Sequence, residues 1–220
     1  MKCIKCQSEW KTEKRMSSLL IPTEVLQGKT RDLMFGRYKW RVLELREEKD
    51  KSCRALLLTE DIVEKRQFNT LSTDVTWKTC ILRQYLNGEF YGKFSKQEQA
   101  KILEVDNLNL DNQWYGTKGG SVAKDKVFLL SIEETVKYFG DSGQLQNKNP
   151  NSEYWIDDKY NNDRVAIFGN KAWWWWLRSP GDGSYFAAHV YSDGYLDLGG
   201  YIVDSEEGGV RPALWLNLYS

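Results

Sequence analysis

"AWWWWLRSPGDG", residues 172–183, places four tryptophans in a row in front of a Leu-Arg-Ser-Pro turn. If this run forms a strand, alternate rings point to opposite faces of the sheet. The four rings then form no continuous apolar patch. We expect two of them to be buried in the core, and the other two to pack under neighbouring loops or to frame a ligand-binding face.

The composition indicates a folded chain without a strong electrostatic field. The 220 residues include 31 basic and 31 acidic side chains, and 14% of the residues are aromatic. A balanced charge gives no long-range attraction to nucleic acid or to an anionic membrane. The aromatic content supplies ample material for a core. We therefore expect a single main domain that acts as a monomer, binds no nucleic acid and does not insert into a membrane.

The N-terminal residues lack the apolar stretch of a signal peptide, and no window approaches the length of a membrane span. A cytoplasmic protein is the simplest expectation, with export by another route or association with a phage as alternatives. We divide the chain into an N-terminal extension, residues 1–27, and a main domain, residues 28–220.

Two of the four cysteines are weak candidates for zinc ligands. Cys3 and Cys6 have the spacing of the first knuckle of a zinc ribbon, but no second knuckle follows them. A complete site would need Cys53, Cys80 or a second chain. We expect Cys53 and Cys80 to be buried free thiols and predict no cofactor.

Local patterns predict a hairpin followed by a helix. Apolar and polar residues alternate over 38–45, a charged turn follows at 46–51, and an apolar run resumes at 55–58. Apolar residues then recur at helical spacing over 77–86, and Asn87-Gly88 predicts the end of that helix.

Capping signals predict two further helices. One begins after Ser95, where Glu98 completes a capping box. Another begins after Ser131, ends at Gly140 and follows a short buried strand at 127–130.

The rest of the chain completes a mixed pattern of strands and helices. The polar stretch 141–162 predicts a long surface loop, and apolar residues at 213–216 predict a closing strand. Together with the hairpin and the capped helices, these segments predict the α+β class.

Catalytic motifs are absent from the sequence. The chain has one histidine and contains no Gly-x-Ser-x-Gly elbow, phosphate-binding loop or His-Glu-x-x-His motif. Paired carboxylates can serve acid-base chemistry on a glycan, although neighbouring acids are more often solvated. The pairs are Asp157 and Asp158, Glu133 and Glu134, and Glu206 and Glu207. We predict no catalytic residue.

The order of sequence blocks resembles a known family. The blocks are "FGRYKWRVLE", "ALLLTEDIVEKRQFN", "TWKTCILRQYLNGEFY", "KVFLLSIEE", "WWWWLRSPG", "AAHVYSDG" and "GVRPALWLNL". They are similar to bacterial and phage-associated domains of unknown function that often occur as variable proteins of diversity-generating retroelements. The resemblance covers residues 33–218 and implies a C-type-lectin-like fold of the formylglycine-generating-enzyme-like subclass, with short antiparallel sheets flanked by two or three helices. The copper-binding cysteine pair of those oxidases has no match near the C-terminus.

The resemblance implies a ligand-binding protein whose variable region spans residues 182–204. Retroelement mutagenesis acts at adenines, and changing the adenines of asparagine codons never yields Lys, Glu, Gln, Met or Trp. None of these five types occurs between residues 182 and 204. The same composition would also suit an ordinary strand-turn-strand binding surface. The absence of these five residue types therefore supports the resemblance but is not evidence of diversification by itself.

Matching the family pattern divides this region into variable and fixed positions. The positions expected to vary and to face outward are Asp182, Gly183, Tyr185, Phe186, His189, Tyr191, Tyr195, Asp197, Leu198, Gly199, Tyr201, Ile202 and Asp204. The fixed frame comprises Ala187, Ala188, Val190, Asp193, Gly194, Leu196, Gly200 and Val203. Scaffold residues outside this region are Trp173, Trp174, Trp175, Trp176, Arg178 and Arg211, and we expect each arginine to form a buried or half-buried pair.

The expected ligand is a macromolecule, and a protein suits the surface best. Tyrosine offers a large contact area at low rotamer cost, and Ser, Gly and Asp add adaptable polar contacts, as in antibody paratopes. A calcium-independent glycan-binding module is the alternative, because the Glu-Pro-Asn and Gln-Pro-Asp sets of calcium lectins are missing. A second possibility is that half of the aromatic residues belong to the core.

Overall fold

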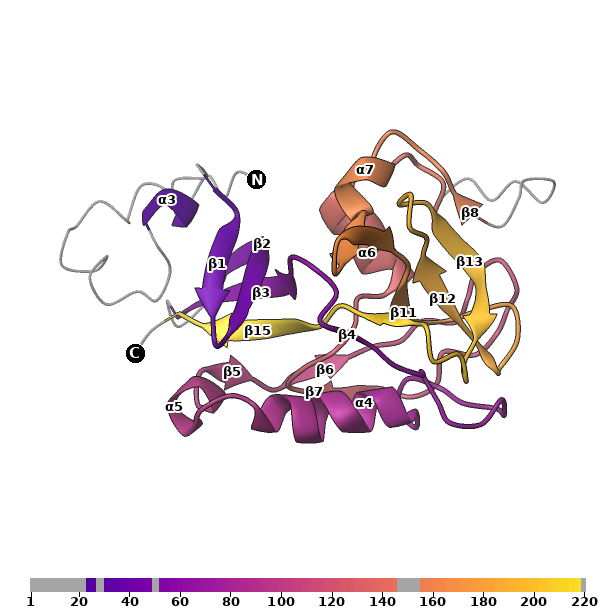
Figure 1. Ribbon diagram of the computed structural model, residues 1–220, viewed down its shortest axis with the longest axis horizontal. Helices are drawn as coiled ribbons and strands as arrows, with labels where there is room; N and C mark the ends of the chain where they lie inside the picture. Colours follow the sequence, from indigo (N-terminus) through magenta and orange to yellow (C-terminus); the bar gives the residue numbers. More distant parts are fainter. Residues whose placement is uncertain (1–22, 27–29, 49–51, 146–154, 219–220) are drawn as a thin grey trace.

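A computed structural model describes residues 23–26, 30–48, 52–145 and 155–218, and the fold is mixed α+β, as predicted (Figure 1). Most strands belong to small antiparallel sheets. In the described part of the chain, no helix is long and apolar enough to cross a membrane. Cys3 and Cys6, with most of the expected N-terminal extension, lie outside the described residues.

An antiparallel five-stranded sheet joins early and late parts of the chain. Its order is β1 (Asp32–Phe35), β2 (Tyr38–Glu47), β3 (Cys53–Thr59), β15 (Ala213–Asn217) and β5 (Ile102–Leu103). The predicted hairpin and closing strand are confirmed, and the last strand pairs with β3 on one side and with β5 on the other. Six of the seven side chains of β3 are buried, which explains its near-continuous apolar sequence.

A six-stranded sheet contains the tryptophan run and the 182–204 segment. Its order is β4 (Glu64–Lys65), β14 (Gly209–Val210), β11 (Trp175–Pro180), β12 (Phe186–Val190), β13 (Leu196–Ile202) and β8 (Trp155–Ile156). Strands β12 and β13 form an antiparallel hairpin at the right of Figure 1, with β8 on its outer edge. β8 lies inside the stretch that we expected to be a long loop.

Two short two-stranded sheets complete the strand pairings. β9 (Ala166–Phe168) pairs with β10 (Lys171–Trp173), and β6 (Val105–Asn107) pairs with β7 (Ala123–Asp125). The prediction of a regular strand over 127–130 is wrong. Its side chains are all buried, but only Phe128 forms a β-bridge, to Ala213.

The helix that follows the hairpin differs from its prediction at both ends. α4 (Ile81–Tyr85) begins at a Cys80 cap and continues as the π-helix η1 (Leu86–Phe90), so Asn87-Gly88 does not end it. The Asn87 side chain instead bonds the chain beside β7, donating to the Val127 carbonyl (2.9 Å) and accepting from the Lys126 N–H (2.7 Å). This tertiary role explains why a local stop signal was overridden.

The predicted capping box at Ser95 and the predicted cap at Ser131 are both present. α5 (Lys96–Gln99) starts at Ser95, with Glu98 bonded back to the cap, and α6 (Ile132–Phe139) starts at Ser131, where Glu134 completes a capping box that was not predicted. α6 ends at Gly140, where φ is 145°. The remaining helices, α3 (Thr23–Leu26) and α7 (Asn161–Arg164), are single turns.

Candidate ligand-binding surface

The tyrosines of the 182–204 segment lie at the protein surface. Tyr185, Tyr191 and Tyr201 expose 44%, 38% and 46% of their area, and Tyr195 is half-buried. Such exposure is unusual for rings that contribute to a core. The alternative in which half of the aromatic residues are core therefore fails for these four positions.

The frame positions between them are mostly buried. The side chains of Ala187, Ala188, Val190, Leu196 and Val203 are each at most 1% exposed. Gly200 has φ of 79°, and an added β-carbon would lie 2.3 Å from the Ala187 carbonyl oxygen, so glycine is required there.

Strand register explains why Leu198 is not part of the surface. His189 pairs with Asp197 and Val190 with Leu196, so successive β13 side chains point to opposite faces. Leu198 has the parity of Leu196 and is 1% exposed in the core. The prediction that Leu198 faces outward is wrong.

His189 is also buried, for a different reason. Its ring lies beneath three aromatic side chains, with centroids 5.1 Å from Trp174, 4.9 Å from Tyr191 and 6.1 Å from Tyr201. It is 2% exposed, so the prediction that it faces solvent is wrong. Among the described residues its Nδ1 atom has no hydrogen-bond partner, and burial lowers the pKa of His189 to about 3.

His189 should therefore make stability depend on pH. It is the only histidine of the chain. Below its unfolded pKa of about 6.5, the unfolded chain gains a proton that the folded protein excludes, so the free energy of unfolding decreases as the pH falls. A fall of about 2 kcal/mol between pH 7 and pH 5 is expected. Urea unfolding of the protein and of His189→Phe at both pH values measures it, and equal pH dependence in the two proteins would contradict this assignment.

The surface rings form two groups with two tryptophans from outside the segment, and the buried ring of His189 contacts both groups. Tyr191 stacks on Tyr195 at 4.5 Å, and Tyr195 contacts Trp155 of β8 at 5.7 Å. At the other end Trp174 contacts Tyr201 at 5.4 Å. We call Trp155, Trp174, Tyr191, Tyr195 and Tyr201 the aromatic surface. Sequence reasoning missed Trp155, which stands in a polar stretch without any strand pattern.

The tryptophan run is divided between two strands. Two rings are buried and two are half-buried, as expected, but the buried pair is Trp175 and Trp176, which are neighbours. Trp175 and Trp176 point to opposite faces as expected, but the four rings do not share one strand, because the chain leaves β10 at Trp173 and enters β11 at Trp175. Both faces of β11 are covered, since Trp175 lies 4.9 Å from the Arg211 guanidinium and Trp176 lies 5.8 Å from Phe68.

The buried indole groups are held by backbone carbonyls. Trp175 donates to the Arg164 carbonyl at 3.1 Å and Trp176 to the Arg66 carbonyl at 2.9 Å. Each N–H is therefore satisfied inside the core. The run forms a rigid wall behind the surface, and only Trp174 takes part in the aromatic surface itself.

Asparagines from a separate loop support the edge of the surface. Asn112 donates to the carbonyls of Pro180 (2.9 Å) and Leu198 (2.7 Å), and Asn109 donates to the Arg178 carbonyl (3.1 Å). Both asparagines are buried. Neither was predicted, because nothing local in the sequence distinguishes a buried bridging asparagine from a loop residue.

A second set of contacts fixes the loop between β11 and β12. Thr117 donates to the Asp182 carbonyl at 2.9 Å, the Val75 N–H donates to the Ser184 carbonyl at 2.9 Å, and the Ser184 hydroxyl bonds Asp74. Of the other positions predicted to vary, Asp182 is exposed. The rest are half-buried: Gly183, Phe186, Asp197, Gly199, Ile202 and Asp204.

The two scaffold arginines are buried in different ways. Arg178 forms the expected pair, with both Glu134 carboxylate oxygens. Arg211 is fully buried, but in the described residues it has no carboxylate within 4 Å, so its predicted pair is wrong. It donates to the carbonyls of Thr59 (2.9 Å), Glu60 (2.9 Å) and Arg164 (3.3 Å). Burial lowers the pKa of Arg211 to about 9.

The described residues contain no group of three or more His, Cys, Asp or Glu side chains that would hold a metal ion. Cys53 and Cys80 are buried free thiols, as predicted. Burial raises the pKa of Cys80 to about 12, which keeps this thiol protonated.

Residues 53–218 match a family described as a domain of unknown function, DUF6273. The chain belongs to this family. A search of curated proteins and a search of solved structures each gave no significant match. The family match begins at the first residue of β3, and β1 and β2, which precede it, pair within the same sheet.

Proposed function

We propose that this DUF6273 protein is the variable protein of a diversity-generating retroelement and binds a macromolecular ligand through the 182–204 segment. The exposed tyrosines carried by a buried, hydrogen-bonded frame are the observation that supports it most. The frame positions hold the hairpin in place, while Tyr185, Tyr191 and Tyr201 expose 38% or more of their area.

We also propose the C-type-lectin-like fold that the sequence blocks imply. The pairing of early strand β3 with last strand β15, the short antiparallel sheets and the capped helix α6 support it. The candidate surface lies on the six-stranded sheet. The first and last strands of the described chain, β1 and β15, belong to the five-stranded sheet (Figure 1).

A protein ligand fits the chemistry of this surface. Interface hot spots are rich in Tyr and Trp, which bury large areas and still hydrogen-bond at their polar ends. The aromatic surface offers five such side chains in two contacting groups, which the buried His189 ring joins. Its support by Asn109, Asn112 and Arg178 lowers the entropic cost of ordering the site on binding.

Removing two rings should abolish binding and preserve folding. A library of random peptides displayed on phage provides the probe, because the natural ligand is unknown. Peptides selected on the wild-type protein should bind Tyr191→Ser/Tyr201→Ser at least about tenfold more weakly, since each side chain supplies interface area. Titration calorimetry measures affinity and thermal unfolding checks the fold.

Met34→Ser is the matched control, because Met34 is 66% exposed on β1 in the other large sheet. This change should leave peptide affinity unaltered. The proposal would be overturned if the tyrosine variant bound the selected peptides as tightly as the wild-type protein did.

The retroelement part of the proposal has a separate genetic test. The source DNA should contain a near-identical repeat of the region encoding residues 182–204, with asparagine codons at the varying positions, beside a reverse transcriptase gene. Genomic sequencing on both sides of the gene detects it. If the gene has no such repeat nearby, the proposal of diversification is overturned. The proposal of ligand binding is still tested by the peptide experiment.

Glycan binding is the second candidate, favoured by the exposed rings of Trp155, Tyr191 and Tyr201. Flat aromatic faces of this kind can stack on sugar rings. A glycan array probed with the same wild-type and tyrosine variants tests it, and binding by the wild-type protein alone would favour this candidate over a protein ligand.

A further inference from the structure

The 182–204 segment has a one-sided charge. It contains Asp182, Asp193, Asp197 and Asp204 and no lysine or arginine, although the whole chain has 31 residues of each sign. Asp182 and Asp193 are exposed, and Asp197 and Asp204 are half-buried. The segment is therefore an acidic region in a chain with no net charge.

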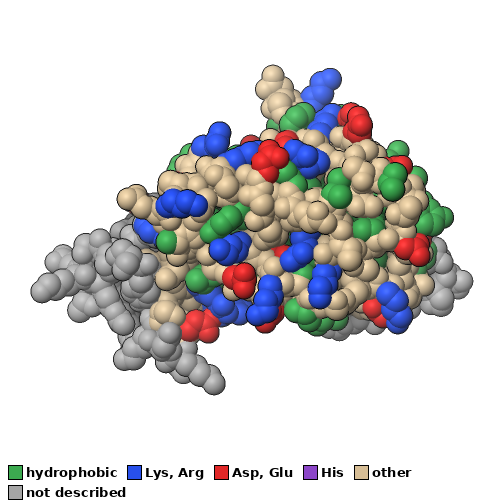
Figure 2. Space-filling view, turned by 90° about the horizontal axis from the view of Figure 1, so that it is seen from below, with side chains coloured by type: hydrophobic (Ala, Val, Ile, Leu, Met, Phe, Trp, Pro, Cys, Tyr) green, Lys and Arg blue, Asp and Glu red, His purple; other side chains and the backbone are tan. Residues whose placement is uncertain are grey.

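These carboxylates also lack ion-pair partners in the described part of the chain. Among the described residues, none of the four has a basic nitrogen within 4 Å, whereas thirteen ion pairs occur elsewhere in that part of the chain. Figure 2 shows the usual pattern on the underside of the molecule, where basic and acidic side chains lie interspersed. The acidic charge of the segment is thus left available to a partner.

Two of the carboxylates act on one another. Burial raises the pKa of Asp197, and the negative charge of Asp182 raises it further, while the N–H groups of Gly199 and Gly200 oppose the shift. The Gly200 N–H donates to Asp197 at 2.9 Å. A cation placed between Asp182 and Asp197 would relieve this repulsion.

A second, independent feature points to a ligand at the same place. His189, which pairs in register with Asp197, is 2% exposed, and its Nδ1 atom has no partner in the described part of the chain. A buried nitrogen without a partner costs free energy. The His189 ring lies against Tyr191 and Tyr201 of the aromatic surface, with ring centroids 4.9 Å and 6.1 Å apart.

We propose that the partner of this chain is a basic protein segment, which presents arginine or lysine side chains to the aromatic surface. This inference rests on the proposed function and specifies the ligand. Guanidinium and ammonium groups stack on tyrosine and tryptophan faces and pair with carboxylates, and an arginine adds N–H donors for His189 Nδ1. Phosphate-rich ligands such as nucleic acids are disfavoured by the same four carboxylates.

The selected phage peptides test the charge of the partner. Peptides recovered on the wild-type protein should be enriched in Arg and Lys and depleted of Asp and Glu relative to the unselected library. Sequencing of the library before and after selection measures this. Selected peptides with an unchanged or acidic composition would overturn the inference.

Charge removal provides the matched test on the protein. Asp182→Asn/Asp197→Asn should lower the affinity for a selected basic peptide by about fivefold to tenfold and reduce the salt dependence of that affinity. Glu89→Gln/Asp106→Asn removes the same charge from exposed positions outside the segment and should leave the affinity unchanged. If both double variants lose the same affinity for the peptide, only the net charge of the protein matters. That result would overturn a specific site in the segment.

The outcomes separate this inference from the proposed function. If Tyr191→Ser/Tyr201→Ser abolishes binding while the selected peptides show no basic bias, the binding surface stands and the basic partner fails. If the tyrosine variant binds the peptides normally, the proposed function fails, whatever the charge of the peptides.

Discussion

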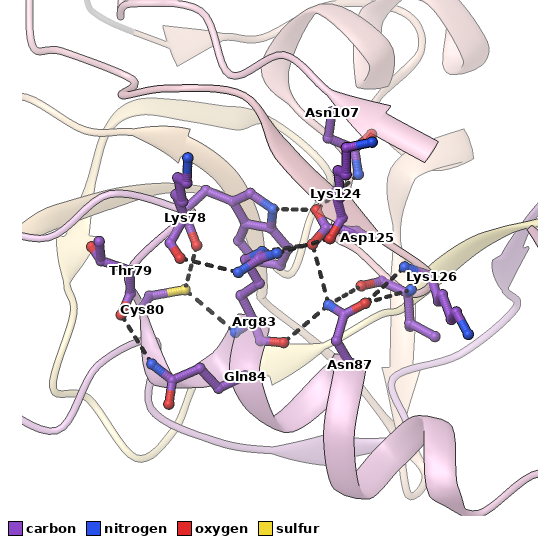
Figure 3. A network of polar contacts seen from close by, with 12 residues as sticks. Lys78, Thr79, Cys80, Arg83, Gln84, Asn87, Asn107, Lys124, Asp125 and Lys126 are labelled. Atoms are coloured by element: carbon purple, nitrogen blue, oxygen red, sulfur yellow. Dashed lines mark hydrogen bonds and ion pairs between the residues drawn. The ribbon is translucent and has the colours of Figure 1, made fainter. Parts of the chain in front are cut away.

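Asp125→Ala is expected to lower the free energy of unfolding by about 3–5 kcal/mol. The carboxylate is fully buried and accepts hydrogen bonds from Trp77 Nε1 (2.8 Å), Asn107 Nδ2 (3.0 Å) and Arg83 Nε (2.6 Å) (Figure 3). Asn87 adds a longer contact at 3.3 Å. Removing Asp125 would leave the Arg83 Nε–H and the buried N–H groups of Trp77 and Asn107 without their acceptor.

Urea unfolding measures this effect, and Asp106→Ala is its control. Asp106 lies on the paired strand β6 with 66% of its side chain exposed, 3.8 Å from Lys124. Exposed ion pairs contribute less than about 1 kcal/mol. Similar losses for the two variants would show that the Asp125 network does not stabilise the fold.

The Asp125 network also supports the candidate surface from a distance. Asp125 fixes β7, and Asn107 fixes β6, at the two ends of the loop that carries Asn109 and Asn112. Those two asparagines hold the backbone at residues 178, 180 and 198. Asp125→Ala should therefore loosen the edge of the 182–204 segment as well as destabilise the protein.

The sequence predicted the elements whose signals are local. The hairpin of β2 and β3, the helix caps at Ser95 and Ser131 and the end of α6 at Gly140 depend on residues within a few positions of one another. Such signals survive folding because the same residues make the same contacts in the final structure.

The incorrect predictions concern residues with long-range partners. Asn87 does not end its helix because its side chain bonds the backbone at residues 126 and 127. Asp125 and Asn112 gave no signal, since their partners are distant in sequence. Their roles follow only from the tertiary arrangement.

Strand register limited the prediction of the candidate site. The composition of residues 182–204 indicated a surface rich in tyrosine, and Tyr185, Tyr191 and Tyr201 are exposed. Composition does not give the face of each residue, and the β12–β13 register shifts between Ala187 and His189. Two residues of β12 oppose four residues of β13 across this irregularity, so a regular pairing pattern cannot be extended through it from the sequence.

Arg178→Met should also lower the free energy of unfolding by about 3–5 kcal/mol. The Arg178 guanidinium pairs with Glu134 and donates to the carbonyls of Leu129 (2.8 Å) and Leu108 (3.2 Å). Methionine fills a similar volume but removes the donor of both carbonyls and leaves Glu134 with only the Ser131 N–H. Arg178→Lys keeps the charge but loses the planar set of guanidinium donors. It should lower the free energy of unfolding by less, about 1–3 kcal/mol.

Arg46→Met is the matched control, because Arg46 pairs with Glu44 while 41% of its side chain stays exposed. It should cost less than about 1 kcal/mol. Glu134 also caps α6, accepting from the Ser131 N–H at 3.0 Å, so Arg178 joins α6 to the strand that leads into the candidate surface. If Arg178→Met unfolds at the same urea concentration as Arg46→Met, the pair does not stabilise this junction, and other contacts, such as those of Asn109 and Asn112, must hold the edge of the surface.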